Sequence, residues 1–137
     1  MDSSNDIMMY LIRLDPVACP RPRVTSKGFV YYPAKYKAFK RNLEAEIAKL
    51  DIEPLPAGVP LSLKVRFSMP KPKRGKHIGY HYKKPDLDNL VKSLCDGLEG
   101  AGVLHNDSQI AHIEAYKSYC EAPSIIFQLS IKSPCNQ

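Results

Sequence analysis

Hydrophobic residues recur with two different periods along this chain, and the order of the two periods limits the folds that it can adopt. Apolar and polar residues alternate over residues 61–69, which predicts a half-buried strand. The polar face of that strand carries Ser62, Lys64, Arg66 and Ser68. Over residues 34–50 the apolar residues recur every three or four positions, which predicts an amphipathic helix that begins after Pro33. Residues 86–99 have the same helical period, and Gly100 is expected to end this second helix.

The remaining segments complete an order of strand, hairpin, helix, strand, helix, strand, strand. Residues 7–14 are short and apolar and predict the first strand, while residues 24–32 predict a small hairpin. Residues 108–120 and 125–131 predict two final strands. Residues 70–85 lack apolar periodicity and are expected to form a loop. This order favours a small α+β domain in which a mixed sheet packs against two main helices.

The size and composition of the chain indicate a single domain. Its 137 residues suffice for one modest core, so we expect one domain over residues 1–137 with a frayed tail at residues 133–137. No apolar run approaches the roughly 18 residues of a membrane span. The N-terminus lacks the basic cluster of a signal peptide. We therefore expect a soluble, cytoplasmic protein.

The cysteines do not predict a metal site. Cys19, Cys95, Cys120 and Cys135 form no CxxC pair, and no His lies at finger-like spacing to them. A structural zinc ion is therefore not expected. In a cytoplasmic protein such cysteines are reduced thiols.

Basic residues gather in two places. The net charge of +6 suits a polyanionic partner, nucleic acid first, although many proteins are basic for solubility alone. One basic group lies in residues 70–85, a segment without acids, and consists of Lys71, Lys73, Arg74, Lys76, Lys83 and Lys84. The other lies in or beside the predicted hairpin and consists of Arg21, Arg23 and Lys27. Contact with a phosphate backbone would release counterions, and Tyr80 and Tyr82 can stack on bases. The alternatives are a solvated linker and plain surface solubility.

Carboxylates gather around the second predicted helix. Asp86 and Asp88 lie at its N-terminal end, where the helix dipole favours negative groups, but one Asp suffices to cap a helix. Two neighbouring carboxylates that both stay ionised need a cation, and Mg²⁺ prefers such oxygen ligands. Lys92 is four residues from both Asp88 and Asp96 and can reach either. Asp107 joins the site if the following strand pairs beside the helix start, and is otherwise a turn residue.

Two other motifs with closely spaced acids do not match the segment that begins at Asp86. An EF-hand loop needs Asp or Asn at the position of Leu90 and Gly at the position of Val91. The aspartyl-phosphatase pattern DxDx[T/V] needs Thr or Val where Leu90 stands. The segment before Asp86 is also not an apolar strand.

The acidic segment and the residues after it resemble the RusA family of Holliday junction resolvases. The residues that carry the resemblance are Pro85-Asp86-Leu87-Asp88-Asn89-Leu90-Val91-Lys92, Asp96-Gly97-Leu98, Gly102-Val103-Leu104 and Asp107-Ser108-Gln109-Ile110. Arg21-Pro22-Arg23, Tyr36 and Lys37 resemble the N-terminal half of the family. The resemblance covers nearly the whole chain in order.

The resemblance implies a homodimeric, Mg²⁺-dependent endodeoxyribonuclease of bacterial or phage origin, with Mn²⁺ as a substitute metal. Such an enzyme cuts four-way DNA junctions symmetrically in recombination and repair. By position, Asp86, Asp88 and Asp107 match the family's catalytic metal-binding acids, and Lys92 matches its essential lysine. Asn106 stands where members often carry a further acid.

Two functional classes follow from these patterns. In the first, Asp86, Asp88 and Asp107 hold Mg²⁺, Lys92 stabilises negative charge or orients Asp88, and the two basic groups bind the DNA backbone. In the second, the protein binds branched DNA without cleaving it, and the acids serve as caps and salt-bridge partners. An RNA-directed nuclease is a third hypothesis. Metal-dependent nicking distinguishes a nuclease from a binding module.

Overall fold

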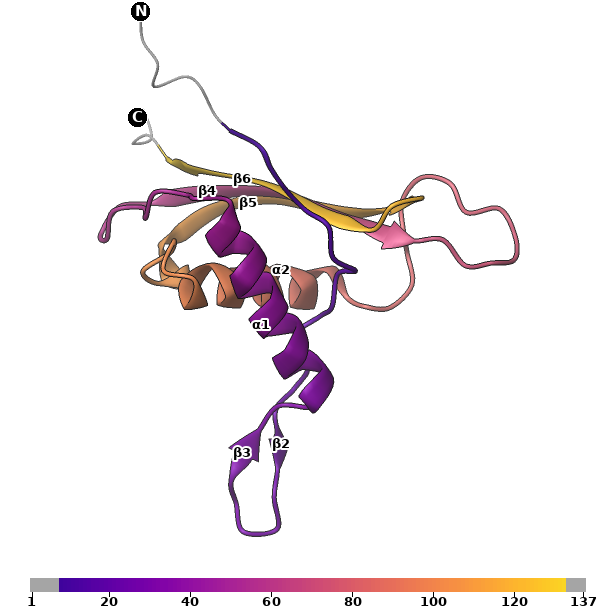
Figure 1. Ribbon diagram of the computed structural model, residues 1–137, viewed down its shortest axis with the longest axis horizontal. Helices are drawn as coiled ribbons and strands as arrows, with labels where there is room; N and C mark the ends of the chain where they lie inside the picture. Colours follow the sequence, from indigo (N-terminus) through magenta and orange to yellow (C-terminus); the bar gives the residue numbers. More distant parts are fainter. Residues whose placement is uncertain (1–7, 133–137) are drawn as a thin grey trace, which may run out of the picture.

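The computed structural model describes residues 8–132, which form a four-stranded sheet with two helices on one of its faces (Figure 1). In chain order the elements are β1 (Tyr10–Ile12), β2 (Arg23–Val24), β3 (Val30–Tyr31), α1 (Ala34–Lys49), β4 (Leu61–Pro70), α2 (Leu87–Gly100), the 3-10 turn η2 (Asp107–Gln109), β5 (Ile110–Cys120) and β6 (Ser124–Ile131). The predicted α+β class and the predicted order of elements are confirmed. Within residues 8–132, no helix is both long and apolar enough to cross a membrane.

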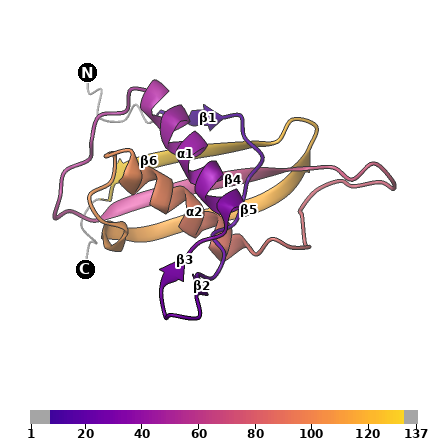
Figure 2. The same ribbon diagram turned by 60° about the horizontal axis from the view of Figure 1, so that its bottom comes forward.

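The main sheet is mixed, with the strand order β1-β6-β4-β5. β4 pairs antiparallel with β6 and parallel with β5, and β6 pairs antiparallel with β1. Parallel neighbours need a crossover connection, which here is α2. The crossover lays α2 across the same sheet face as α1, as both views show (Figures 1 and 2). β5 is left at the edge of the sheet, beside α2.

The core lies between the helices and the sheet, because each element turns one apolar face inward. The buried side chains of α1 are Tyr36, Phe39, Leu43 and Ile47. In α2 the fully buried side chains are Leu90, Leu94 and Leu98. On the sheet they include Leu61, Leu63, Phe67, Ile125 and Phe127. Burying one such side chain stabilises the fold by about 1.5–3 kcal/mol relative to leaving it exposed.

The structure corrects several details of the sequence-based prediction. β1 is shorter than predicted, because pairing with β6 extends only over Tyr10–Ile12. Residues 108 and 109 belong to η2 rather than to the following strand, because the Asn106 side chain accepts a hydrogen bond from the backbone N of Ser108 at 2.9 Å. Ser62 and Ser68 are buried rather than exposed, since β4 is flanked by strands on both sides. The predicted tail at residues 133–137 lies outside the described residues.

Two basic arms project from the body, and the start of α2 lies between them (Figures 1 and 2). We call the first arm, residues 21–32, the hairpin arm, and it contains the short strands β2 and β3. The second, residues 70–85, we call the loop arm. The loop arm leaves the end of β4 and returns along β5, where Tyr80 and Ser118 form an isolated bridge. The segment predicted to be an irregular loop is therefore docked on the sheet at its base.

Candidate active site

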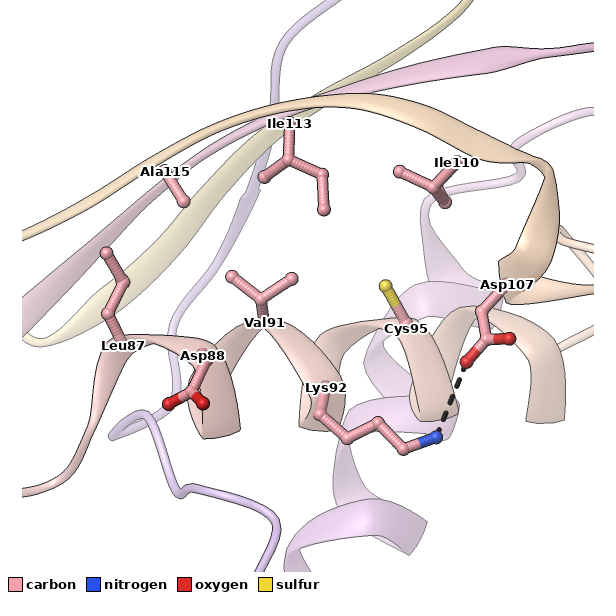
Figure 3. Close-up of a pocket in the computed structure, with 9 residues that line it drawn as sticks. All are labelled: Leu87, Asp88, Val91, Lys92, Cys95, Asp107, Ile110, Ile113 and Ala115. Carbon is pink, nitrogen blue, oxygen red and sulfur yellow. Dashed lines mark hydrogen bonds and ion pairs between the residues drawn. The ribbon is translucent and has the colours of Figure 1, made fainter.

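An open groove of about 770 Å³ lies between α2 and β5 (Figure 3). Most of its lining is apolar and comes from Leu87, Val91, Cys95, Ile110, Ile113 and Ala115. Three charged residues also line it, namely Asp88, Lys92 and Asp107. The structure thus brings three of the four predicted site residues to one groove, while Asp86 precedes the helix and is not part of the groove lining.

The helical period of α2 determines which side chains face the groove. Asp88 lies in the first turn and Lys92 lies one turn later, so both project from the same side of the helix. Asp107 arrives from η2, and its carboxylate points toward α2 (Figure 3). Local sequence thus places the α2 residues, whereas the connection after α2 places Asp107.

Asp86 occupies the N-cap position of α2 in an extended conformation, but its side chain makes no capping hydrogen bond. The N–H of Leu90 donates to the carbonyl of Asp86 at 3.2 Å, which is the first backbone hydrogen bond of the helix. The segment before Asp86 is held by Lys117, whose ammonium donates to the carbonyls of Lys83 and Pro85. The carboxylate of Asp86 is therefore not used for capping.

Lys92 contacts one of the two acids that helical spacing predicted, Asp96, and it contacts Asp107 in place of Asp88. Its Nζ donates to Asp96 Oδ1 at 2.9 Å and to Asp107 Oδ2 at 3.4 Å, rather than to Asp88. The reason is that η2 brings Asp107 alongside the helix, so that the ammonium lies between two carboxylates. The hydrogen bond to Asp96 raises the pKa of Lys92 above its ordinary value. Lys92 is therefore a fixed positive charge and not a proton acceptor near neutral pH.

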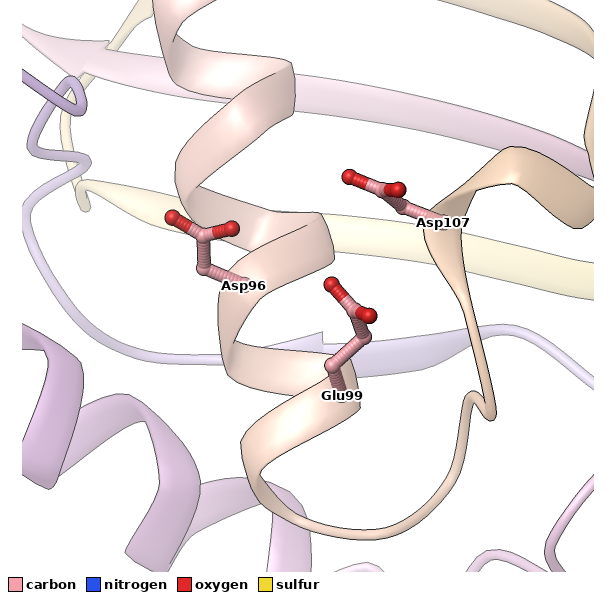
Figure 4. Close-up of side chains that lie close together, drawn as sticks. All are labelled: Asp96, Glu99 and Asp107. Atoms are coloured by element: carbon pink, nitrogen blue, oxygen red, sulfur yellow. The ribbon is translucent and has the colours of Figure 1, made fainter.

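A second acidic cluster became visible only in the structure. Carboxylate oxygens of Asp96, Glu99 and Asp107 lie within 4.8 Å of one another (Figure 4). Among the described residues 8–132, Asp86 and Asp88 do not form such a cluster with Asp107. The sequence predicted Asp96 as a partner of Lys92 and did not predict that it lies beside Glu99 and Asp107. A hint was available in the spacing, because Asp96 follows Lys92 by four residues.

Asp96 differs from the other acids because both of its oxygens already accept hydrogen bonds. Oδ2 accepts from the Tyr36 hydroxyl at 2.7 Å and from the Cys19 thiol at 3.8 Å, and Oδ1 accepts from Lys92. Its side chain is only 17% exposed. Asp96 is thus engaged in the protein interior before any ligand arrives.

Asp86, Asp88 and Asp107 have fewer of their carboxylate oxygens engaged than Asp96 has. Asp88 accepts only the backbone N–H of Asn89 at 3.0 Å, and Asp107 accepts only Lys92, among the residues that the structure describes. Together with Asp86, they retain carboxylate oxygens for a divalent ion, and such hard oxygen donors are what Mg²⁺ binds. Asp86, Asp88 and Asp107 therefore offer the type of donor that Mg²⁺ takes, although their carboxylate oxygens do not all lie within 4.8 Å of one another.

The thiols contribute no reactive group to the groove. Cys19, Cys95 and Cys120 are free, and Cys135 lies outside the described residues. Burial raises the pKa of Cys95 to about 12, so its thiol stays protonated at neutral pH. Cys95 therefore acts as part of the apolar lining.

The predicted DNA-binding residues lie on the two arms. Lys71 is paired with Glu121 at 2.8 Å. Within the described part of the chain, the others form no salt bridge: Arg21, Arg23, Lys27, Lys73, Arg74, Lys76, Lys83 and Lys84. All of these are exposed. Tyr80 and Tyr82 are also exposed, at 72% and 80%. The arms thus present positive charge and aromatic rings on both sides of the start of α2.

Acids that can hold a divalent cation and basic arms that can contact phosphates are groups that metal-assisted cleavage of nucleic acid uses. Comparison with protein families agrees, because the family model described as endodeoxyribonuclease RusA matches residues 14–130. The chain belongs to the RusA endodeoxyribonuclease family, as the sequence resemblance predicted. It is also similar to YqaN of Bacillus subtilis (strain 168), an uncharacterized protein. The two are 30% identical over 134 residues, which cover 88% of this chain and 93% of YqaN.

Proposed function

We propose that this protein resolves Holliday junctions by paired hydrolysis of phosphodiester bonds, in DNA recombination and repair. Its family is one of DNA endonucleases, which supports the reaction class. The observation that carries the proposal is that Asp88, Lys92 and Asp107 face one groove in a chain of this family. The two basic arms on either side of α2 favour a substrate with several DNA branches over a single duplex.

We assign Mg²⁺ to Asp86, Asp88 and Asp107, with Mn²⁺ as a substitute. The carboxylate oxygens that these residues retain support the assignment, and the engaged oxygens of Asp96 speak against a site centred on that residue. The chemistry that a bound Mg²⁺ supplies is polarisation of the scissile phosphate and a lowered pKa for the attacking water.

The protein's own groups have separate tasks in this proposal. Lys92, kept protonated by Asp96, donates to a phosphate oxygen and stabilises the negative charge that grows there during hydrolysis. The arms bind the DNA backbone through charge.

We further propose that the enzyme acts as a homodimer. A four-way junction has two-fold symmetry, so a two-fold dimer would present one site to each of two strands. Light scattering coupled to gel filtration measures this directly. A monomer at the concentrations at which junctions are cut in pairs would contradict it.

The test is cleavage of a synthetic four-way junction with Mg²⁺ and with EDTA. We expect paired nicks at symmetric positions with Mg²⁺ and none with EDTA. Asp88→Asn should lower the cleavage rate by about 100-fold or more, the size of effect seen when one group that stabilises transition-state charge is removed. Junction binding without metal-dependent nicking would instead favour the non-cleaving DNA-binding module, and cleavage by Asp88→Asn at the wild-type rate would contradict the site.

A further inference from the structure

A chain of hydrogen bonds runs from the core of α1 to the groove. The Tyr36 hydroxyl donates to Asp96 Oδ2 at 2.7 Å, and Lys92 donates to the other oxygen, Asp96 Oδ1, at 2.9 Å. The same ammonium reaches Asp107 at 3.4 Å. Hydrogen bonds through Asp96 and Lys92 therefore link three separate parts of the fold, α1, α2 and η2.

The burial of these groups decreases steadily toward the groove. Tyr36 is 3% exposed and its ring is part of the core. The side chain of Asp96 is 17% exposed, and that of Lys92 is 50% exposed. A half-exposed lysine has many accessible rotamers, and fixing one of them costs conformational entropy. Packing alone does not hold the ammonium of Lys92 in place, so its position depends on its hydrogen bonds, of which the one to Asp96 is the shorter.

Asp96 is itself held by contacts beyond its own helix. An ordinary lysine–aspartate pair four residues apart on a helix surface is weak, because both side chains move in solvent. Here the second oxygen of Asp96 is bound by the Tyr36 hydroxyl and contacted by the Cys19 thiol. The backbone N of Cys19 also donates to the carbonyl of Asn89 in α2 at 2.9 Å. The carboxylate therefore has one orientation, and this orientation directs its other oxygen, Oδ1, toward Lys92.

We propose that Tyr36 and Asp96 are positioning residues, which hold the Lys92 ammonium beside Asp107 for the cleavage step. This inference rests on the proposed function, because it assigns to Lys92 a direct role in hydrolysis. Neither Tyr36 nor Asp96 touches the phosphate. Each acts through Lys92, and Tyr36 acts through Asp96.

The alternative is that the Tyr36–Asp96 hydrogen bond only ties α1 to α2. In that case its loss lowers the stability of the fold but leaves the cleavage rate of the folded enzyme unchanged. If the hydrogen bond positions Lys92, its loss slows the chemical step of cleavage and leaves the DNA affinity unchanged. The rate of a single turnover at saturating enzyme and Mg²⁺, measured beside the junction Kd, separates the two.

The main variant is Tyr36→Phe, which removes one hydroxyl and keeps the buried ring. Its matched control is Tyr10→Phe. Tyr10 lies in β1, outside both arms and the groove lining, and its ring packs on that of Phe127 with centroids 5.4 Å apart. Among the described residues its hydroxyl hydrogen-bonds only to the sulfur of Met8, at 3.9 Å. We expect Tyr36→Phe to lower the single-turnover rate about tenfold, with the Kd changed less than twofold, as for one lost hydrogen bond to a charged group. Tyr10→Phe should match the wild type. A rate for Tyr36→Phe within twofold of the wild type would overturn the inference.

A second variant tests whether Tyr36 acts through Asp96. Asp96→Asn keeps the size of the side chain and should lower the rate further, and the double variant with Tyr36→Phe should be no slower than Asp96→Asn alone, because both act on one group. Additive losses would contradict this.

NMR of the lysine ammonium groups tests positioning without cleavage. The Lys92 signal, assigned by its loss in Lys92→Arg, should be protected from solvent exchange in the wild type and in Tyr10→Phe, but not in Tyr36→Phe. If the wild type cuts no junction, the proposed function fails while the NMR result still decides the positioning. An unchanged Lys92 signal in Tyr36→Phe would overturn the positioning.

Discussion

Asp96 and Asp107 contact the same ammonium, yet the two residues have different surroundings. Asp96 is 17% exposed and is bound through both oxygens, whereas Asp107 is 38% exposed and is bound through one. A carboxylate that already accepts hydrogen bonds on both oxygens must give some of them up to bind a cation, which costs free energy. At the scale of single residues, hydrogen-bond partners thus separate the metal-binding acids that we propose from an acid that orients a lysine.

The metal ligands that we propose and the cluster of Asp96, Glu99 and Asp107 predict opposite results for a substitution of Glu99. Glu99 belongs to the cluster with Asp96 and Asp107, but not to the set that we propose. We therefore expect Glu99→Gln to bind Mg²⁺ and to cleave a junction within about threefold of the wild type, while Asp88→Asn loses both. Calorimetric titration with Mg²⁺ and Mn²⁺ measures the affinity without DNA. Loss of metal binding in Glu99→Gln, with retention in Asp88→Asn, would move the metal to the Asp96–Glu99–Asp107 cluster.

The two helices pack closely where α2 has a glycine. A Cβ on Gly97 would lie 2.5 Å from Leu43 Cδ2 and 2.8 Å from Leu43 Cγ, and Leu43 is fully buried. The close approach of α1 to α2 also brings the Tyr36 hydroxyl within reach of Asp96. At the scale of elements, one small residue therefore sets the helix spacing on which the site depends.

The close approach predicts a stability change against helix propensity. Gly97→Ala should lower the free energy of unfolding by up to about 2 kcal/mol, because overpacking costs about 1–3 kcal/mol and Ala brings a gain of about 1 kcal/mol to a helix. Gly100→Ala is the matched control, since the nearest atom there is the carboxylate end of Glu44, which can swing away. Urea unfolding measures both. Equal stability of the two variants would contradict the packing argument.

The base of the loop arm carries a histidine whose charge state affects the docking. Burial lowers the pKa of His81 below its ordinary value of 6.5, with smaller contributions from Lys117 and Lys83. The backbone N of His81 donates to the carbonyl of Lys117 at 2.9 Å, and its ring packs on Tyr119. The folded state therefore favours the neutral imidazole at the point where the arm joins β5.

The direction of this pKa shift fixes the direction of the pH effect. Above about pH 6.5 the imidazole is neutral in both states, and as pH falls the unfolded chain takes up the proton first, so docking is fully stable above that pH and weakens below it. We expect hydrogen-exchange protection of the His81 and Tyr119 amides to fall between pH 7 and pH 5.5. His81→Gln should show a smaller pH dependence. Equal dependence in both proteins would mean that another group is responsible.

Charge is distributed unevenly over the whole molecule. The exposed basic side chains without acidic partners concentrate on the two arms, while the groove between them carries the acids. DNA that contacts both arms would bring its backbone over the start of α2. The acids would repel that backbone unless a cation lay between them, so binding and metal uptake are expected to support each other.

Salt dependence of junction binding tests the arms. Replacing Lys73, Arg74 and Lys76 by Gln, or Arg21, Arg23 and Lys27 by Gln, should reduce the slope of log K against log salt by about 2–3, roughly 0.9 for each lost phosphate contact. The control removes the same charge from Lys64, Arg66 and Lys132, which lie away from both arms. An unchanged slope in either arm variant would exclude that arm from the DNA interface.

The sequence by itself determined the α+β class, the order of elements and the positions of α1 and α2, because hydrophobic period, Pro33 and Gly100 act locally. It also identified the family, through a contiguous acidic segment that needs no folded partner to be recognised.

Tertiary structure alone decided which residues of the site contact one another. Spacing on one helix predicted that Lys92 reaches both Asp88 and Asp96. It does contact Asp96, but the turn at η2 brings Asp107 to it in place of Asp88. The hydrogen bond from Tyr36 to Asp96 joins residues 60 positions apart, and it exists because Gly97 lets α1 approach α2. Such contacts depend on how elements cross in space, which local periodicity does not encode.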